Sequence, residues 1–312
     1  MAKYAFGVDV GGTTVKMGLF DTEGNVFDKW EIPTRTEDNG SKILPDVAQA
    51  VKDKMAEKNI SAADVEGVGI GVPGPVDDNG IVHRAVNLFW GVTDARKQLS
   101  DLLDGMKVKV GNDANVAALG EMWKGGGVGF DSIVMVTLGT GVGGGIIING
   151  NIVNGSTGAG GEIGHIHVRD DETENCNCGN AGCLEQYASA TGIVRLANRR
   201  LAKDDKASVL RNEEISAKSV FDAVKAGDEL AIEVAEEFGK ILGDALGCIA
   251  AVVNPQAFVI GGGVSKAGDV LIGYISKNYE KTAFHACRDA AFKLATLGND
   301  AGIFGSAKLV LN

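Results

Sequence analysis

The hydrophobic and polar positions of the chain follow two periods, and their alternation predicts strands interleaved with helices. Strands are predicted where short apolar runs end in turn-forming or acidic residues, at 3–10, 15–20, 25–33, 65–72, 108–110, 133–136, 145–148, 258–260 and 292–297. Helices are predicted where apolar residues recur every three or four positions, at 41–58, 114–123, 230–253, from about 267, and at the C-terminus. Strands that alternate with helices are typical of the α/β class.

The length of 312 residues allows one large domain or two ordinary ones. A strand, a Gly/Thr turn and a return strand open the chain, and the same arrangement recurs at 133–148. We place the domain boundary near residues 113–127. The expected division is a small N-terminal α/β domain over 1–113, with the C-terminal helix (about 300–312) packed on it, and a large C-terminal α/β domain over 114–299.

The composition narrows the class of protein. Hydrophobic residues make up 45% of the chain and charged residues 23%, which excludes a disordered chain, a collagen-like chain and a small disulfide scaffold. The formal net charge of −11 disfavours binding to nucleic acid. No apolar run reaches the roughly 20 residues that a membrane span needs. The chain runs from its first residues directly into a strand without a signal-peptide pattern, so we expect a cytoplasmic protein without a membrane partner.

Glycine is strongly over-represented, with 45 residues against an average frequency of about 7%. Three glycine loops follow predicted strands, at 11–14, 138–145 and 261–263, and the first comes directly after Asp9. Glycines let backbone N–H groups converge on a phosphate, threonine hydroxyls add donors, and a strand-end carboxylate can hold Mg²⁺. Neither a Walker A nor a Rossmann fingerprint is present. The alternative is that these loops only reverse the chain.

A second cluster of candidate functional residues, which includes potential metal ligands, lies between residues 162 and 185. One imidazole and three thiolates, His165, Cys176, Cys178 and Cys183, form a tetrahedral zinc set with no open position, which predicts a structural zinc. Three reduced cysteines without a metal are the alternative, and His167 is a rival ligand.

Three carboxylates accompany these features. Glu162 and Glu185 flank the predicted zinc ligands and suit the hydroxyls of a sugar, since each can accept one or two hydrogen bonds. Asp113 ends a predicted strand and could take the proton from an attacking hydroxyl. Its alternative role is that of a helix N-cap.

The sequence resembles the ROK family of repressors, open reading frames and sugar kinases, and among them the bacterial ATP-dependent glucokinases. The resemblance covers nearly the whole chain, in the motifs DVGGTTVK (9–16), GVPGPVD (71–77), AVNLFW (85–90), GNDANVAALGE (111–121), TLGTGVGGG (137–145), GAGGEIGH (158–165), CNCGNAGCLEQYAS (176–189) and VIGGGVS (259–265). Thr14 stands where the family commonly has lysine, and Lys16 follows two residues later. The resemblance implies an actin-like, hexokinase-like (ribonuclease H-like) two-domain fold with an active-site cleft between the domains.

The resemblance also implies roles for individual residues. Asp113 looks like the general base that deprotonates the sugar 6-hydroxyl. The implied sugar ligands are Gly74, Asn87, Asn112, Asp113, Glu162, His165 and Glu185. The implied ATP and Mg²⁺ site comprises Asp9, Gly11, Gly12, Thr13, Thr14, Lys16, Thr140, Gly141, Gly261 and Gly262. The zinc would hold the sugar loop in place, and His165 would then serve both the zinc and the sugar.

The expected reaction is the transfer of a phosphoryl group from ATP to glucose, giving glucose 6-phosphate. Fructose, N-acetylmannosamine, N-acetylglucosamine and allose are alternative substrates, because kinases for them share the motifs. The stretch with Asn87, Leu88 and Trp90 resembles the glucokinases more than the amino-sugar kinases, so the resemblance favours glucose. A sugar-sensing regulator is a further alternative, but such family members carry a helix-turn-helix before the core, and here the phosphate loop begins near residue 9. The resemblance also implies a homodimer.

Overall fold

The protein is described here from a computed structural model, which describes residues 2–312. It contains two five-stranded mixed sheets surrounded by helices, so the predicted α/β class is confirmed. Contacts divide the described residues into two compact units. The first holds the residues up to 129, 145–161 and 297–312, and the second holds 130–144 and 162–296. The division of the chain into domains at residue 113 stays a prediction.

The first sheet has the strand order β3-β2-β1-β4-β7. Its strands are β1 (Tyr4–Val10), β2 (Thr14–Asp21), β3 (Val26–Pro33), β4 (Val65–Val72) and β7 (Val108–Asn112). β1, β2 and β3 pair antiparallel, whereas β4 is parallel to β1 and β7 is parallel to β4. The carboxyl ends of β1, β4 and β7 therefore meet at one edge of this sheet.

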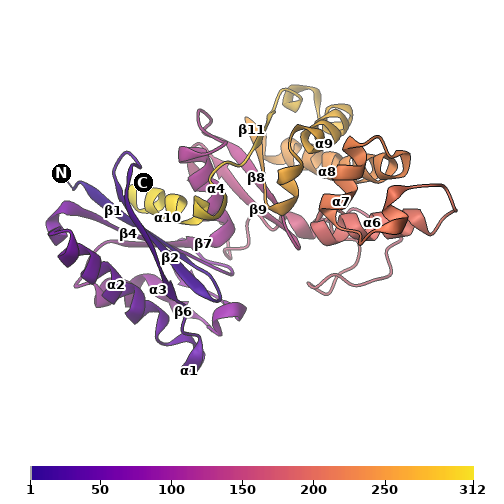
Figure 1. Cartoon of the computed structure of the whole chain (residues 1–312). Coiled ribbons are helices and arrows are strands. Elements are labelled where there is room, and N and C mark those ends of the chain that lie inside the picture. Colours follow the sequence, from indigo (N-terminus) through magenta and orange to yellow (C-terminus); the bar gives the residue numbers. More distant parts are fainter. Residues whose placement is uncertain (1) are drawn as a thin grey trace. The chain divides into compact units, whose positions relative to one another are not determined.

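Helices cover both faces of the first sheet (Figure 1). The helices of this unit are α1 (Glu37–Gly40), α2 (Ile43–Glu57), α3 (Ala95–Leu102), α4 (Asp113–Lys124) and α10 (Ala301–Leu311), and two short strands, β5 (Ile81–Val82) and β6 (Thr93–Asp94), pair beside them. The apolar faces of α2 and α3 join the core on one side. On the other side α10 lies so close to the strands that a Cβ at Gly69 would come 1.7 Å from the Ser306 carbonyl oxygen. Glycine at this position therefore lets the helix pack directly on the sheet.

The second sheet has the order β10-β9-β8-β11-β12. Its strands are β8 (Ile133–Leu138), β9 (Val142–Ile148), β10 (Asn151–Ile152), β11 (Ala257–Gly261) and β12 (Ala291–Leu294). As in the first sheet, the opening strand lies between its return strand and two strands that run parallel to each other. The repeat expected from the two strand–turn–strand segments is thus present in the strand order of both sheets.

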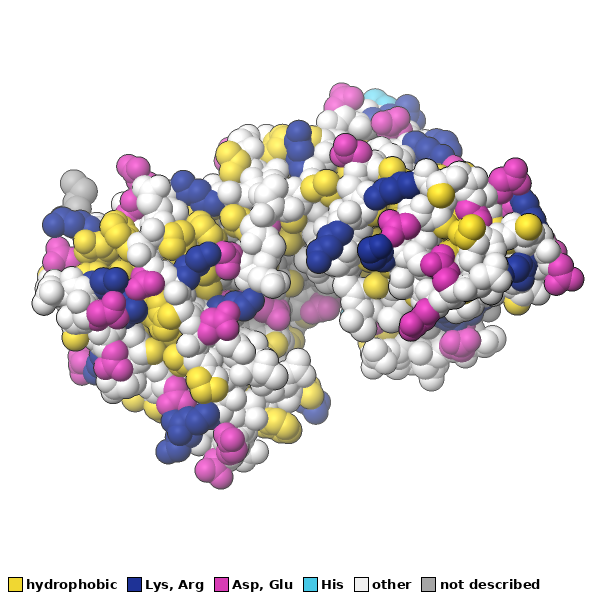
Figure 2. Space-filling model, in the orientation of Figure 1, with side chains coloured by type: hydrophobic (Ala, Val, Ile, Leu, Met, Phe, Trp, Pro, Cys, Tyr) yellow, Lys and Arg dark blue, Asp and Glu magenta, His cyan; other side chains and the backbone are white. Residues whose placement is uncertain are grey.

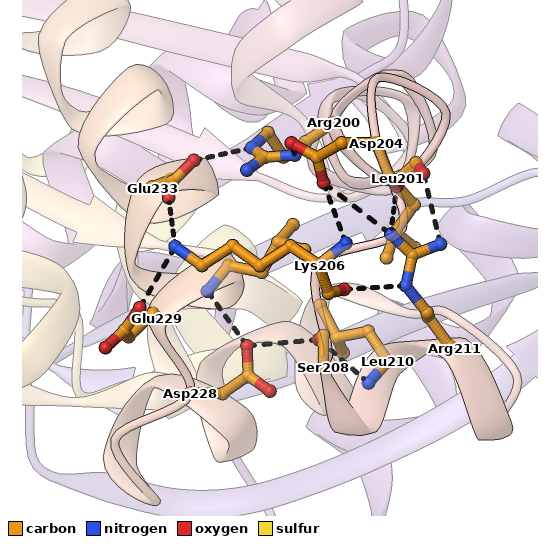
Figure 3. A network of polar contacts seen from close by, with 11 residues as sticks. Arg200, Leu201, Asp204, Lys206, Ser208, Leu210, Arg211, Asp228, Glu229 and Glu233 are labelled. Atoms are coloured by element: carbon orange, nitrogen blue, oxygen red, sulfur yellow. Dashed lines mark hydrogen bonds and ion pairs between the residues drawn. The ribbon is translucent and has the colours of Figure 1, made fainter.

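The second unit is mostly helical. Its helices are α5 (Glu185–Ala188), α6 (Ala190–Leu201), α7 (Ala217–Lys225), α8 (Glu229–Val253) and α9 (Asp269–Thr282). Asp228 begins α8 by accepting hydrogen bonds from the Leu230 and Ala231 N–H groups, and it also accepts one from Ser208. Lys206 pairs with Glu229 and Glu233 of α8, so a network of charges holds the segment between α6 and α7 against this helix (Figure 3).

The structure corrects two element boundaries. β9 begins at Val142, three residues before the predicted strand. The strand predicted at 292–297 ends at Leu294, because the chain leaves the ladder and Leu297 donates its N–H to the Glu121 carboxylate instead. Helices α3, α6 and α7 were not predicted individually. No helix among residues 2–312 is long and apolar enough to cross a membrane.

The chain carries a net negative charge, but acidic and basic side chains are mixed over its surface. Lys and Arg side chains are interspersed with Asp and Glu over the face drawn in Figure 2. All five cysteines are free thiols.

Candidate active site

The first group of site residues lies at the carboxyl ends of β1, β4 and β7. The parallel register places Asp9 of β1 opposite Gly71 of β4, and Val72 opposite Asn112 of β7. Asp113 follows as the first residue of α4. In open α/β sheets this edge is where ligands bind. The structure therefore brings together Asp9, Asn112 and Asp113, which the sequence analysis singled out separately.

Asn112 fixes the position of Asp113. Its Oδ1 accepts hydrogen bonds from the Ala114 N–H at 3.0 Å and the Asn115 N–H at 3.1 Å, so Asn112 is the N-cap of α4. The alternative assignment of Asp113 as the N-cap is therefore wrong by one residue. The Nδ2 of Asn112 donates to the Gly74 carbonyl at 3.1 Å and to Asp113 Oδ1 at 3.0 Å. These bonds use both lone pairs and both amide protons, so Asn112 orients its neighbours through its whole side chain.

Asp113 is exposed at the start of the helix. Its Oδ1 also accepts the Ala114 N–H at 2.8 Å. A carboxylate in the first turn is stabilised by the helix dipole. The carboxylate is thus held in one orientation while it remains accessible to a reactant, which is what a general base requires.

Gly74 lies next to this carboxylate. Its backbone has a φ of +94°, and a Cβ there would come 2.0 Å from the Arg84 carbonyl oxygen. Only glycine fits at this position. The Gly74 carbonyl is thereby held where it accepts the hydrogen bond from Asn112.

The first glycine loop joins β1 to β2. The Gly11 N–H donates to the Thr14 carbonyl at 3.0 Å, and Thr34 donates its hydroxyl to the Gly11 carbonyl at 2.7 Å. Gly11, Gly12 and Thr13 are exposed. Asn87, from the 3₁₀ turn Val86–Leu88, lies beside Gly12, where an added Cβ would be 3.7 Å from the Asn87 Cβ. The loop is anchored at its base and open at its tip, as a phosphate-binding loop must be.

Asp9 is the carboxyl group in this first group of residues whose pKa is shifted. Burial, followed by the charge of Asp113, raises the pKa of Asp9 from 3.8 to about 6, against the opposing effect of Lys16. Lys16 faces Asp9 across the hairpin and donates from Nζ to the Asn299 carbonyl at 3.3 Å. Two carboxylates that repel each other at a strand edge favour a cation, so the pair fits a bound Mg²⁺.

The second group lies in the second unit and centres on four potential metal ligands. The ligand atoms of His165, Cys176, Cys178 and Cys183 all lie within 4.8 Å of one another. The Cys178 and Cys183 sulfurs are 3.6 Å apart, and the Cys176 sulfur is 3.8 Å from His165 Nδ1. Zn–S bonds of about 2.3 Å in a tetrahedron require sulfur separations of about 3.8 Å. The spacing therefore fits one zinc ion.

Two further observations support this set. His167 uses both ring nitrogens elsewhere, 3.0 Å from the Ala181 carbonyl and 2.9 Å from Asp170, so it is not the fourth ligand. Burial raises the pKa of the Cys176 thiol to about 12, with the nearby Glu185 carboxylate acting in the same direction. A bound cation would reverse that effect, because coordinated thiols are deprotonated.

Glu162 and Glu185 lie on either side of His165. Glu185 Oε1 is 3.8 Å from His165 Nδ1 and 2.9 Å from the Cys176 sulfur, whereas Glu162 Oε2 is 4.0 Å from His165 Nε2. Glu185 also borders the second glycine loop, since a Cβ at Gly141 would come 2.6 Å from its Oε2. Two carboxylates and an imidazole thus form one polar surface beside the cluster.

The second and third glycine loops meet within the same unit. Gly262 has a φ of +84°, and a Cβ there would lie 2.5 Å from the Leu138 carbonyl oxygen at the end of β8. Thr140 is exposed, and its carbonyl accepts the Thr191 hydroxyl from α6 at 2.9 Å. Thr140, Gly141, Gly261 and Gly262 therefore gather at the carboxyl ends of β8 and β11.

Sequence reasoning missed Glu172, which anchors the loop between His165 and Cys176, two of the four potential metal ligands. Its side chain is 1% exposed and pairs with Arg195 at 2.9 Å and Arg199 at 3.1 Å, and the Tyr187 hydroxyl donates to it. Burial alone would raise the pKa of Glu172, but these partners and the Glu174 N–H lower it to about 2. The available signal was the spacing of Arg195 and Arg199, which places both on one face of α6.

The comparison with known proteins identifies the family of the chain. The ROK family model matches residues 5–312, and the chain belongs to the ROK family. It is 44% identical to a glucokinase of Halalkalibacterium halodurans over 99% of this chain and 95% of that protein. A ROK glucokinase from Streptomyces griseus, solved in complex with glucose and AMPPNP, superposes with a TM-score of 0.71 at 34% identity over 98% of both chains. A ROK hexokinase from Thermus thermophilus gives a TM-score of 0.79 at 29% identity, covering 98% of this chain and 97% of that one. The expected actin-like, hexokinase-like fold is therefore confirmed.

Proposed function

We propose that the protein is a glucokinase, which transfers the terminal phosphoryl group of ATP to the 6-hydroxyl of glucose. The observation that carries the proposal is the Asp113 carboxylate, exposed and oriented by Asn112 beside the perturbed acid Asp9. The similar ROK glucokinases support glucose as the acceptor and ATP as the donor.

In the proposed reaction, Asp113 accepts the proton of the glucose 6-hydroxyl as that oxygen attacks the γ-phosphorus. The bond between the γ-phosphorus and the bridging oxygen breaks, and ADP leaves with the electron pair. Asn112 holds Asp113 in the orientation that this proton transfer needs. Phosphoryl transfer depends mainly on alignment and charge neutralisation, and general bases contribute about 10²–10⁴-fold.

Phosphate binding is assigned to the glycine loops. The loop residues Gly11, Gly12, Thr13 and Thr14, together with Thr140 and Gly141, would bind the phosphates of ATP through backbone N–H groups and threonine hydroxyls, and Lys16 adds a positive charge. Gly261 and Gly262 would lie near the nucleoside. Asp9 would help to hold Mg²⁺, which neutralises phosphate charge when it is bound.

Sugar binding is assigned to both groups. Gly74, Asn87 and Asn112 of the first group and Glu162, His165 and Glu185 of the second would bind the hydroxyls of glucose. A zinc ion bound by His165, Cys176, Cys178 and Cys183 would have no open position, and these residues would hold Glu185 and Glu162 in place. We further propose that the enzyme works as a homodimer in the cytoplasm, where ATP is available, and that it supplies glycolysis.

The proposal is tested by ADP release from MgATP across a panel of hexoses, with zinc-loaded protein and a control without sugar. A response to glucose that exceeds the responses to fructose, allose and the two N-acetyl amino sugars is expected. A larger response to another sugar would replace the substrate. A folded, zinc-loaded protein that is silent with every sugar would contradict the kinase assignment.

A further inference from the structure

Glu121 is a fully buried carboxylate that the proposed reaction does not use. It lies on α4, two turns after Asp113, and its exposed fraction is 0%. Its Oε1 accepts the Leu297 N–H at 2.8 Å, and its Oε2 accepts the Gly126 N–H at 2.8 Å. Burial of a charged group is costly unless hydrogen bonds compensate it, so a carboxylate in this place indicates a specific need.

The two donors, the N–H groups of Gly126 and Leu297, lie close to two of the points where the chain passes between the units. Gly126 lies three residues before residue 129, where the chain passes into the second unit, and Leu297 is the residue at which it returns. The chain passes between the units at four points, and one carboxylate therefore binds the backbone at two of them.

The helix that carries Glu121 is held rigidly. α4 crosses α10 at glycines, and a Cβ at Gly305 would come 1.5 Å from the Val116 carbonyl oxygen. Glu121 thus binds both connecting segments to the same helix that begins with Asp113.

We propose that Glu121 is a positioning residue for the kinase reaction: it fixes the backbone at Gly126 and at Leu297, close to where the chain passes to and returns from the second unit, to the helix that begins with Asp113. The inference rests on the proposed function. Its structural part, the attachment of the two segments, can be measured independently of activity.

The site is specific for a carboxylate. Both oxygens accept from N–H groups, whereas a glutamine can offer an oxygen to only one of them and must turn its NH₂ toward the other. There is also no room beside it, because a Cβ at Gly125 would come 1.9 Å from Glu121 Oε2. Gly125 has a φ of −117°, outside the left-handed region, and Gly125→Ala would press its Cβ on the same contact.

The experiment compares wild type, Glu121→Gln, Gly125→Ala and the double variant. Asn278→Ala is the control, because Asn278 is a buried amide whose Nδ2 donates to the Tyr274 carbonyl within α9, away from both connecting segments. The readouts are KM for glucose, kcat, the melting temperature, and hydrogen exchange at the Gly126 and Leu297 amides. If Glu121→Gln fails to fold, Gly125→Ala gives the same readouts.

The expected result is a higher KM for glucose in both single variants than in wild type. Faster exchange at Gly126 and Leu297 should accompany it, and the double variant should be little worse than either single one. Asn278→Ala should lower the melting temperature and leave KM unchanged. A folded Glu121→Gln with wild-type KM would overturn the inference.

The same measurements distinguish a failure of the proposed kinase function from a failure of the inference about Glu121. If the kinase function fails, wild type is inactive with every sugar, and the exchange data decide about Glu121. Unchanged exchange at both amides would then overturn the attachment, whereas selective loss of protection at these two amides would support it.

Discussion

The two groups of site residues are ordered by different means. In the first unit, Asn112 and Asp113 lie at the junction of β7 and α4, where ladder and helix-cap hydrogen bonds define the backbone. In the second unit, residues 162–184 contain one 3₁₀ turn, at Ile163–His165, and no named helix or strand. Isolated backbone bridges hold this loop together with side chains, which act through the ligand cluster and through Glu172 with its two arginines.

Of the two groups, the second is the one that a bound metal would support. The first group takes its geometry from the sheet and needs no ligand to form it. The second brings four potential metal ligands together, and a bound cation would stabilise the thiolate forms of its cysteines.

The largest effect is expected when the chemistry of the first group is removed without disturbing its geometry. Asp113→Ala should lower kcat by about 10²–10⁴-fold, because the general base is lost. The variant should fold normally, since Asn112 still caps α4. Initial rates and a melting curve measure both effects. Asp269→Ala is the matched control, an exposed aspartate in the first turn of α9. Strong residual turnover in Asp113→Ala would remove Asp113 from this role.

Breaking the second group should affect metal and sugar together. Cys178→Ser should lower zinc affinity by more than about a hundredfold, because a serine hydroxyl is a poor zinc ligand. Affinity for glucose should fall with it, since Glu162, His165 and Glu185 lose their common support. Metal analysis and calorimetry with glucose give both quantities. Cys248→Ser, at an exposed cysteine outside the cluster, is the control. A zinc-free variant with normal glucose affinity would show that the metal is incidental.

A smaller effect is expected on the stability of the second group when Glu172, which is not one of its potential metal ligands, is replaced. Glu172→Gln should reduce the free energy of unfolding by about 2–3 kcal/mol at pH 7, because it breaks a buried ion pair. The pKa of Glu172 is lowered from 4.5 to about 2, so its contribution is present above pH 4.5 and is lost as the pH falls toward 2.

Urea unfolding between pH 2 and 7 should therefore show the wild-type and Glu172→Gln curves converging at low pH. Glu174→Gln is the control, because the Glu174 side chain contacts the same arginines but is 71% exposed. It should cost less than about 1 kcal/mol. Equal losses in both variants would contradict the role of Glu172.

The smallest effect is expected in the first group, where replacing Asp9 should raise the free energy of unfolding. The pKa of Asp9 is raised from 3.8 to about 6, so its favourable contribution is complete below pH 3.8 and is lost as the pH rises through 6. Asp9→Asn stays neutral and should raise the free energy of unfolding by about 1–2 kcal/mol above pH 6, while activity falls. Asp53→Asn, at an exposed position in α2, should change neither. If the free energies of unfolding of wild type and Asp9→Asn changed in parallel with pH, ionised Asp9 would not destabilise the folded protein.

Short-range patterns made much of this predictable from the sequence. The glycine loops, the strands before them and the four zinc ligands are local in the chain, and so is the helix that begins at Asp113. The alternative role of Asp113 as the N-cap is wrong by one residue, because both residue types favour that position. Which of them caps depends on the backbone angles at the strand end.

The interactions that sequence reasoning missed are long-range. Glu172 meets arginines more than 20 residues away, and Glu121 binds the backbone of Leu297, 176 residues later. A backbone N–H carries no sequence signal, so no pattern could have paired it with Glu121. Buried charges of this kind become visible only once the packing is known.

The central claim is most directly tested by identifying the product. Zinc-loaded protein is incubated with glucose and MgATP, and the phosphorylated sugar is identified by ³¹P NMR alongside the ADP formed. The account predicts glucose 6-phosphate and ADP in equal amounts, with neither formed when glucose is absent. Phosphate on another hydroxyl, or ADP formed without any phosphorylated sugar, would contradict it.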